Sequence, residues 1–155
     1  MMGYFHSMHT VARRKASLRR LSELIQKKED GIYYALEQDL GKPRLENYAS
    51  EIAPTLDEIK VFLKNLSGWS KRRYVSTKWW SLGHFMARSF IQPTPLGRVL
   101  IISPWNYPFQ LAMIPLIGAV AAGNKIVLKP SEFAPQTSRL LKELIYEWID
   151  DDSVK

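Results

Sequence analysis

Two short apolar segments, each followed by a helical pattern, constrain the fold of this sequence most strongly. GRVLIIS (Gly97–Ser103) precedes a helix predicted over Pro108–Ala122, and KIVLK (Lys125–Lys129) precedes an amphipathic helix predicted over Gln136–Ile149. Continuous apolar strands that alternate with helices are typical of a parallel sheet covered on both faces. We therefore expect a Rossmann-like βαβα segment with its two strands side by side.

The residues before this segment predict helices. Residues 11–28 place leucines at helical spacing, and Asp30 is a suitable N-cap for a second helix that Gly41 ends. A third helix is predicted over Glu46–Leu66, with a kink or a late start at Pro54. The fold class is therefore α/β, with N-terminal helices followed by the parallel segment.

Residues 79–94 differ in character, because aromatic and β-forming residues surround Gly83 and predict a hairpin or paired strands. His84 in this stretch has no second metal-type residue beside it, so we expect a structural role and no metal site. We divide the chain into a helical part (1–78), a hairpin (79–94) and a first βαβα part (95–155). The sequence stops after a helix, where a doubly wound sheet needs its next strand, so we expect a partial domain.

The basic residues are unevenly distributed. Residues 1–92 contain 16 Lys and Arg against 9 Asp and Glu, whereas residues 93–155 contain six of each. The densest patch, Lys71–Trp80, suggests a solvated face or a subunit contact, with nucleic-acid or membrane-surface binding as the alternative. No charge occurs from Val99 to Asn124, but Pro104, Pro108 and Pro115 interrupt this run. We therefore expect no membrane span and no nucleic-acid partner.

Polar sequences follow both predicted strands, SPWNYP after the first and KPSE after the second. Ligands of such sheets bind beyond the carboxyl ends of the strands, and neighbouring strands bring these loops to one rim. Asn106 can donate a hydrogen bond to a developing negative charge, or it can cap the helix that follows. Lys129 and Glu132 can bond the two hydroxyls of a ribose, or they can lie in an ordinary surface turn. The residues alone leave both pairs of alternatives open.

The segment PLGRVLIISPWNYPFQLAMIPLIGAVAAGNKIVLKPSEFAP (Pro95–Pro135) closely resembles aldehyde dehydrogenases, in particular their class 3 branch. The pattern ALEQDLGKP…E…E, from Ala35 to Glu51, is similar to the same branch. The resemblance extends from about Val11 onward and rests on the combination of PWNYP, AAGN and KPSE at this spacing. It implies a partial aldehyde dehydrogenase fold, the N-terminal part only, with the catalytic domain absent.

The resemblance also implies residue roles. Asn106 becomes an oxyanion-hole donor, and Tyr107 borders the substrate pocket. A larger set lines the path of a nicotinamide cofactor, either NAD or NADP: Ile102, Ser103, Trp105, Lys129, Ser131 and Glu132. The hairpin implies a homodimer in the full-length enzyme, and the implied location is cytoplasmic.

In that family a cysteine thiolate attacks the aldehyde to form a thiohemiacetal, and a glutamate later activates water to release the carboxylic acid. This sequence contains no cysteine. We therefore expect the N-terminal portion of an NAD(P)-dependent aldehyde dehydrogenase that is inactive alone. The alternative is a non-catalytic truncated module that binds a dinucleotide or a partner.

Overall fold

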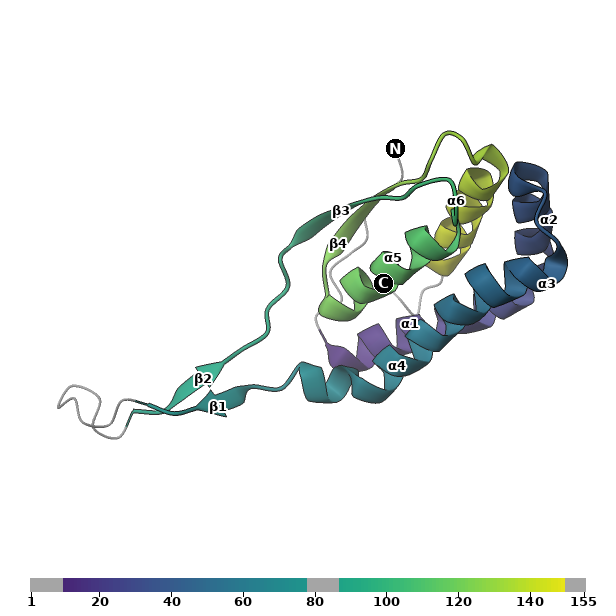
Figure 1. Cartoon of the computed structure of the whole chain (residues 1–155). Helices are drawn as coiled ribbons and strands as arrows, with labels where there is room; N and C mark the ends of the chain where they lie inside the picture. Colours follow the sequence, from purple (N-terminus) through teal and green to yellow (C-terminus); the bar gives the residue numbers. More distant parts are fainter. Residues whose placement is uncertain (1–9, 78–86, 150–155) are drawn as a thin grey trace.

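The computed structural model describes residues 10–77 and 87–149. Figure 1 shows a bundle of helices beside two strands, with a thin arm that extends away from the bundle. This arrangement confirms the expected α/β class, with N-terminal helices followed by a parallel βαβα segment. No helix among the described residues combines the length and the apolar character that a membrane crossing needs.

The first two helices follow each other almost without a break. α1 (Val11–Lys27) begins after Thr10, whose side chain accepts a hydrogen bond from Arg13 N, and α2 (Glu29–Leu40) ends at Gly41 with a φ of 64°. The prediction that Asp30 is an N-cap is wrong. The backbone turns at Lys28, whose carbonyl already accepts from Ile32 N, so Asp30 lies inside the first turn of α2.

The predicted third helix is three joined pieces: α3 (Arg44–Asn47), a π-helical turn η1 (Tyr48–Ile52) and α4 (Ala53–Trp69). Pro54 lies in the first turn of α4, directly after the π-turn, so the helical run that begins at Arg44 changes its hydrogen-bond pattern just before Pro54 instead of starting late there. A π-turn inserts extra backbone into a helix and rotates the side chains that follow. Glu51, inside η1, is fully buried as a result of its position there.

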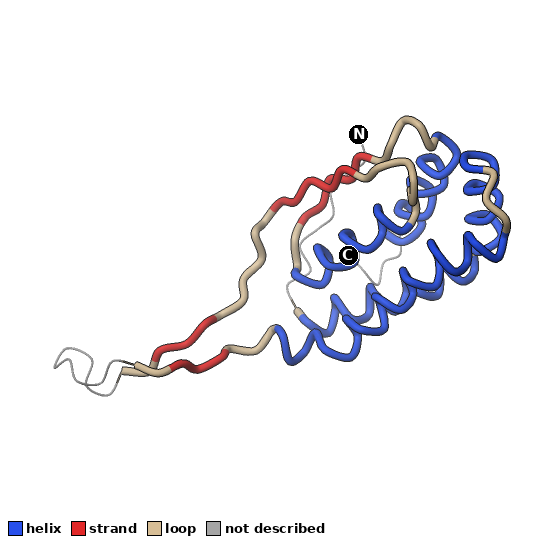
Figure 2. Tube along the Cα trace, viewed as in Figure 1, coloured by secondary structure: helices blue, strands red, loops and turns tan. Residues whose placement is uncertain are grey.

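The arm is a two-stranded antiparallel ribbon. β1 (Arg73–Val75) pairs with β2 (Ser89–Ile91), and Tyr74 lies opposite Phe90. Figure 2 shows these strands outside the helical bundle. The paired strands begin earlier than predicted, because the basic segment that contains Arg73 forms one of them. Residues 79–86 of the predicted hairpin, His84 included, lie outside the described residues.

The second half forms the expected strand–helix–strand–helix unit. β3 (Arg98–Ile102) and β4 (Lys125–Lys129) are parallel, with α5 (Gln110–Ala122) between them in sequence and α6 (Pro135–Ile149) after them. α5 begins two residues later than predicted, because Pro108 lies in a turn before it.

The expectation that both faces of the sheet are covered is wrong for the described chain. Ile101 and its neighbours Ile126 and Leu128 are buried under the helices, whereas Leu100 is 60% exposed and Ile102 is 65% exposed. Successive side chains of a strand point to opposite faces, so these values separate a covered face from a bare one. Figure 1 shows the helices together on one side of the strands.

One hydrophobic core joins the N-terminal helices to the βαβα unit. It runs from Leu18 and Leu21 of α1 through Ile59 of α4 to Met113 of α5 and Trp148 of α6. Trp148 also donates from its indole Nε1 to the carbonyl of Ser17, at 2.9 Å. The helices of the first half therefore fix the position of both loops that follow the strands.

Candidate functional site

The two loops leave the same edge of the sheet at adjacent positions. Ile102 pairs with Lys129 in the parallel register, and Ser103 N donates to the Lys129 carbonyl at 3.1 Å. The loop of residues 103–109 follows β3, and the loop of residues 130–134 follows β4. The structure thus brings the two polar sequences to one rim, as the strand pattern predicted.

Asn106 is exposed, and its side-chain amide has no hydrogen-bond partner among the described residues. The alternative role as a helix cap does not hold, because α5 has Phe109 at its N-cap position and no side-chain cap from its own loop. Its first amides bind a residue from elsewhere: Glu51 Oε2 accepts from Phe109 N at 3.1 Å and from Gln110 N at 2.8 Å. The amide of Asn106 therefore remains available to a ligand.

Glu51 is a fully buried carboxylate, and its other oxygen, Oε1, lies 3.6 Å from Lys42 Nζ. Burial raises the pKa of Glu51, while the N–H donors of Gln110 and Phe109 and the ammonium of Lys42 oppose this shift. A negative group at the first turn of α5 also complements the helix dipole. The positive end of α5 is therefore already occupied by a protein carboxylate.

Lys129 and Glu132 bind each other at the tip of the second loop, with 3.1 Å between Nζ and Oε2. Both side chains are exposed, at 59% and 69%. A hydrogen bond with its own backbone N–H and the contact with Lys129 lower the pKa of Glu132. An ammonium and a carboxylate held this close offer a donor and an acceptor to a pair of neighbouring hydroxyls.

The other predicted site residues divide into exposed and buried groups. Ile102, Trp105 and Tyr107 are exposed, and the ammonium of Lys42 lies 3.9 Å from the centre of the Tyr107 ring. Ser103 and Ser131 are buried, and Ser131 Oγ accepts from Phe133 N inside its own loop. Because both side chains are buried, contact between these serines and a ligand would run through backbone atoms.

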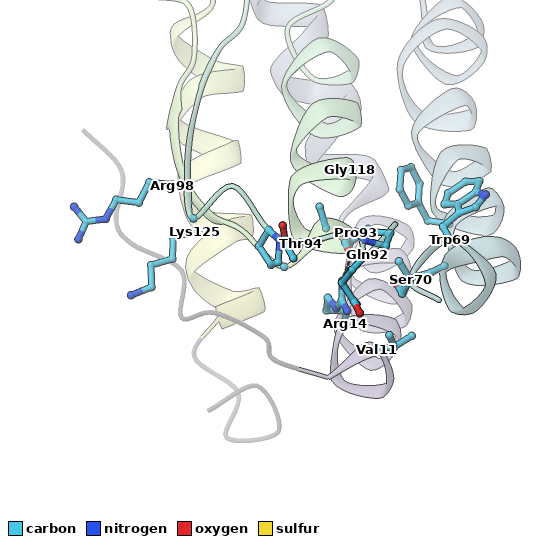
Figure 3. Close-up of a pocket in the computed structure, with 17 residues that line it drawn as sticks. Val11, Arg14, Trp69, Ser70, Gln92, Pro93, Thr94, Arg98, Gly118 and Lys125 are labelled. Atoms are coloured by element: carbon cyan, nitrogen blue, oxygen red, sulfur yellow. Dashed lines mark hydrogen bonds between the residues drawn. The ribbon is translucent and has the colours of Figure 1, made fainter. Parts of the chain in front are cut away.

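A cavity of about 780 Å³ lies at the opposite end of the strands, near Gly97 and Lys125, and contains none of the predicted site residues. Figure 3 shows its wall formed by Trp69, Pro93 and Arg14, with the long side chains of Arg98 and Lys125 directed away from them. The described residues hold no cluster of three or more metal-type side chains. The loops at the carboxyl edge remain the candidate site.

Comparison with known proteins assigns this arrangement to a family. The model of the aldehyde dehydrogenase family matches residues 5–154. The chain belongs to the aldehyde dehydrogenase family. It is 44% identical over 154 residues to the 4,4'-diaponeurosporen-aldehyde dehydrogenase of Staphylococcus aureus, covering 98% of this chain and 33% of that protein. It is 44% identical over 137 residues to the mouse aldehyde dehydrogenase family 3 member B2, covering 88% and 28%.

A solved structure gives the same assignment. The substrate-bound state of Staphylococcus aureus AldH superposes with a TM-score of 0.85 and 46% identity, covering 93% of this chain and 30% of that one. The chain therefore spans about a third of the length of these aldehyde dehydrogenases, and its fold is a partial aldehyde dehydrogenase fold.

Sequence reasoning did not identify Lys42 and Glu51 as residues that contact this candidate site. Both belong to the pattern from Ala35 to Glu51 that carries the resemblance, but their contacts with the loop span 64 and 58 residues of sequence. A glutamate inside a helical pattern carries no signal that it is buried. The π-turn that contains Glu51 also has no sequence signature of its own.

Proposed function

We propose that this chain is the N-terminal part of an NAD(P)-dependent aldehyde dehydrogenase that oxidises an aldehyde to a carboxylic acid. One observation carries the proposal. Glu51 occupies the amides at the start of α5, which leaves the exposed amide of Asn106 free, in a loop that leaves the same edge of the sheet as the loop of the Lys129–Glu132 pair. Family membership supplies the reaction class.

In the proposed reaction Asn106 donates a hydrogen bond to the aldehyde oxygen as a nucleophile attacks the carbonyl carbon. Such a donor acts mainly on the transition state, because negative charge accumulates on that oxygen only during attack. Tyr107, two-fifths exposed next to Asn106, borders the aldehyde. This sequence has no cysteine, so a thiolate nucleophile has to come from outside these residues.

The second loop and the end of β3 form the proposed cofactor side. Lys129 and Glu132 would hold a ribose diol, and the exposed side chains of Ile102 and Trp105 offer apolar surface to the same ligand. Backbone atoms at Ser103 and Ser131 complete the contacts. When bound, the nicotinamide accepts the hydride of the aldehyde. Glu132 favours a free 2′-hydroxyl, as in NAD, while Lys129 also permits the 2′-phosphate of NADP.

We further propose that the arm, with residues 79–94, contributes to a homodimer of the complete enzyme and that the enzyme is cytoplasmic. The exposed apolar residues Tyr74, Phe90 and Ile91 on the short ribbon support a contact with another subunit.

The test uses a chimera in which this chain replaces the matching segment of the Staphylococcus aureus enzyme. Aldehyde-dependent NAD(P)H formation by the chimera is expected. Asn106→Ala should lower its kcat by about 10²–10³, the usual effect of losing one oxyanion donor. Asn65→Ala, which removes an amide bonded to Val61 within α4, is the control and should leave kcat unchanged. An unchanged kcat in Asn106→Ala would overturn the oxyanion assignment.

The absence of cysteine from the sequence favours one second candidate, a non-catalytic module that binds a dinucleotide or a partner. Calorimetric titration of NAD into the chain distinguishes the two. We expect weak binding or none, because the two loops of this chain supply only part of the surface that a dinucleotide contacts. Micromolar affinity together with no activity in the chimera would support the module.

A further inference from the structure

Lys42 is a cation that contacts the loop of Asn106 from the first half of the chain. It follows Gly41, the residue that ends α2, and only 16% of its side chain is exposed. Its ammonium donates to the carbonyl of Asn106 at 3.0 Å and lies over the ring of Tyr107. A cation over an aromatic face is attracted to it, so both contacts hold the ammonium at this loop.

Two buried side chains, those of Asn47 and Glu51, hold Lys42 in place. Asn47, fully buried in α3, donates from Nδ2 to the Lys42 carbonyl at 3.0 Å and fixes the main chain. Glu51 fixes the ammonium, because its Oε1 has no hydrogen-bond partner and faces Lys42 Nζ at 3.6 Å. A buried carboxylate without a counter-charge is costly, so this ion pair resists separation.

The same carboxylate holds the far end of the loop through Phe109 N and Gln110 N. Glu51 and Lys42 thus contact consecutive parts of one segment: Glu51 holds the start of α5, and Lys42 holds Asn106 itself. The backbone of Asn106 is attached through its carbonyl, while its side-chain amide stays exposed and without a protein partner. Attachment at the main chain orients a side chain without consuming its donors.

We propose that Lys42, oriented by Glu51, is the positioning residue that fixes Asn106 in its donor orientation. The inference rests on the proposed role of Asn106 as an oxyanion donor. A displacement of about 1 Å in a catalytic group can lower a rate about 10²-fold, so a group that fixes the donor contributes to turnover without touching the substrate.

The first test measures the loop in the 155-residue chain by NMR. Lys42→Met should shift the carbonyl ¹³C resonance of Asn106 and increase fast backbone motion at Asn106 and Tyr107. The amides of Phe109 and Gln110 should keep their slow hydrogen exchange, because Glu51 still binds them. Lys42→Arg should restore most of the wild-type values, since it keeps the charge and the donors. An Asn106 signal and mobility unchanged in Lys42→Met would overturn the proposal.

Glu51→Gln provides a second variant for the same measurement. Exchange at Phe109 and Gln110 should become about tenfold faster, the effect of weakening one hydrogen bond by about 1.4 kcal/mol, and Asn106 should become more mobile as well. Lys60→Met removes an exposed lysine paired with Asp57 on α4 and is the matched control. It should leave all four loop resonances unchanged.

The second test is a double-mutant cycle in the chimera. Lys42→Met should lower kcat while leaving KM for the aldehyde nearly unchanged, and it should have no further effect in the Asn106→Ala background, because Lys42 acts through Asn106. Additive losses would overturn the positioning role and leave the oxyanion donor intact. If Asn106→Ala has no effect on kcat, the proposed function fails, and the NMR measurement still decides whether Lys42 orders the loop.

Discussion

At the scale of single residues, the buried carboxylate of Glu51 determines which hydrogen-bond donors at the site remain available to a ligand. Glu51 takes the place that Asn106 or a ligand anion could otherwise occupy at the first amides of α5. An asparagine shortly before a helix normally suggests an N-cap. Because Glu51 fills that role for α5, Asn106 in SPWNYP is not needed as a cap. The free amide of Asn106 is the product of a contact made by a residue 55 positions earlier in the chain, which no local pattern reveals.

Glu51 should make stability depend on pH. Burial raises its pKa in the folded chain above the ordinary value of 4.5, so the folded state holds the proton more tightly than the unfolded state. The free energy of unfolding should therefore fall relative to that of Glu51→Gln as the pH rises from 4.5 through the folded pKa.

Urea unfolding of both proteins between pH 4 and pH 8 measures this difference. Above the folded pKa the two stabilities should keep a constant separation. Glu46→Gln changes an exposed glutamate of α3 and should follow the wild-type profile. Parallel profiles for wild type and Glu51→Gln over the whole range would contradict the expectation.

At the scale of elements, the two helices of the βαβα unit are capped at both ends by charged side chains from the first half of the chain. At the N-terminal ends, Glu51 binds α5 and Asp39 binds α6 through Gln136 N and Thr137 N, at 3.1 and 2.7 Å. At the C-terminal ends, Arg14 donates to the Ala121 carbonyl and Arg20 to the Glu147 carbonyl, at 2.6 and 2.7 Å. Each sign matches the helix dipole.

Removing one of these caps should destabilise the chain without changing its fold. Asp39→Ala leaves two backbone N–H groups of α6 without their acceptor and should lower the free energy of unfolding by about 1–2 kcal/mol. Asp57→Ala is the control, because Asp57 is an exposed aspartate paired with Lys60, and should cost under about 1 kcal/mol. Urea unfolding compares them, and equal losses would show that the tertiary cap contributes nothing special.

The sequence predicted these elements better than it predicted their ends. The spacing of apolar residues located α1, α4, β3, β4, α5 and α6, because the residues that form this pattern are the ones buried in the core. It misplaced the start of α2 at Asp30 and that of α5 at Pro108, where tertiary caps replace local ones. It also missed β1, because its three residues are all exposed and show no alternation of buried side chains, and one of them, Arg73, is charged.

At the scale of the whole molecule, the described residues cover one face of the β3–β4 sheet and leave the other face exposed. Residues of the apolar run VLII lie on both faces. The continuous hydrophobic run correctly predicted a parallel strand, but it did not predict that only one face of that strand is covered. The loops at one rim were predictable because parallel strands bring their carboxyl ends together. Lys42 and Glu51 were not, because their contacts depend on how the helices of the first half pack.

Adjacent residues of β3 should therefore respond very differently to truncation. Ile101→Ala opens space in the core and should lower the free energy of unfolding by about 2–5 kcal/mol, whereas Leu100→Ala, on the bare face, should change it by about 0.5 kcal/mol or less. Chemical denaturation of the 155-residue chain measures both. Similar losses at the two positions would mean that Leu100 is covered in solution.

The shared core also governs how this chain can be dissected. A truncation that keeps only residues 95–155 would strip α5 and α6 of every charged cap and leave Trp148 without the Ser17 carbonyl that its indole binds. In such a piece the side chain of Trp148 would lose the helices that bury it and would be exposed to solvent. Work on the two loops at the carboxyl edge of the sheet should keep the polypeptide whole from α1 onward, because the helices of the first half are the scaffold that positions those loops.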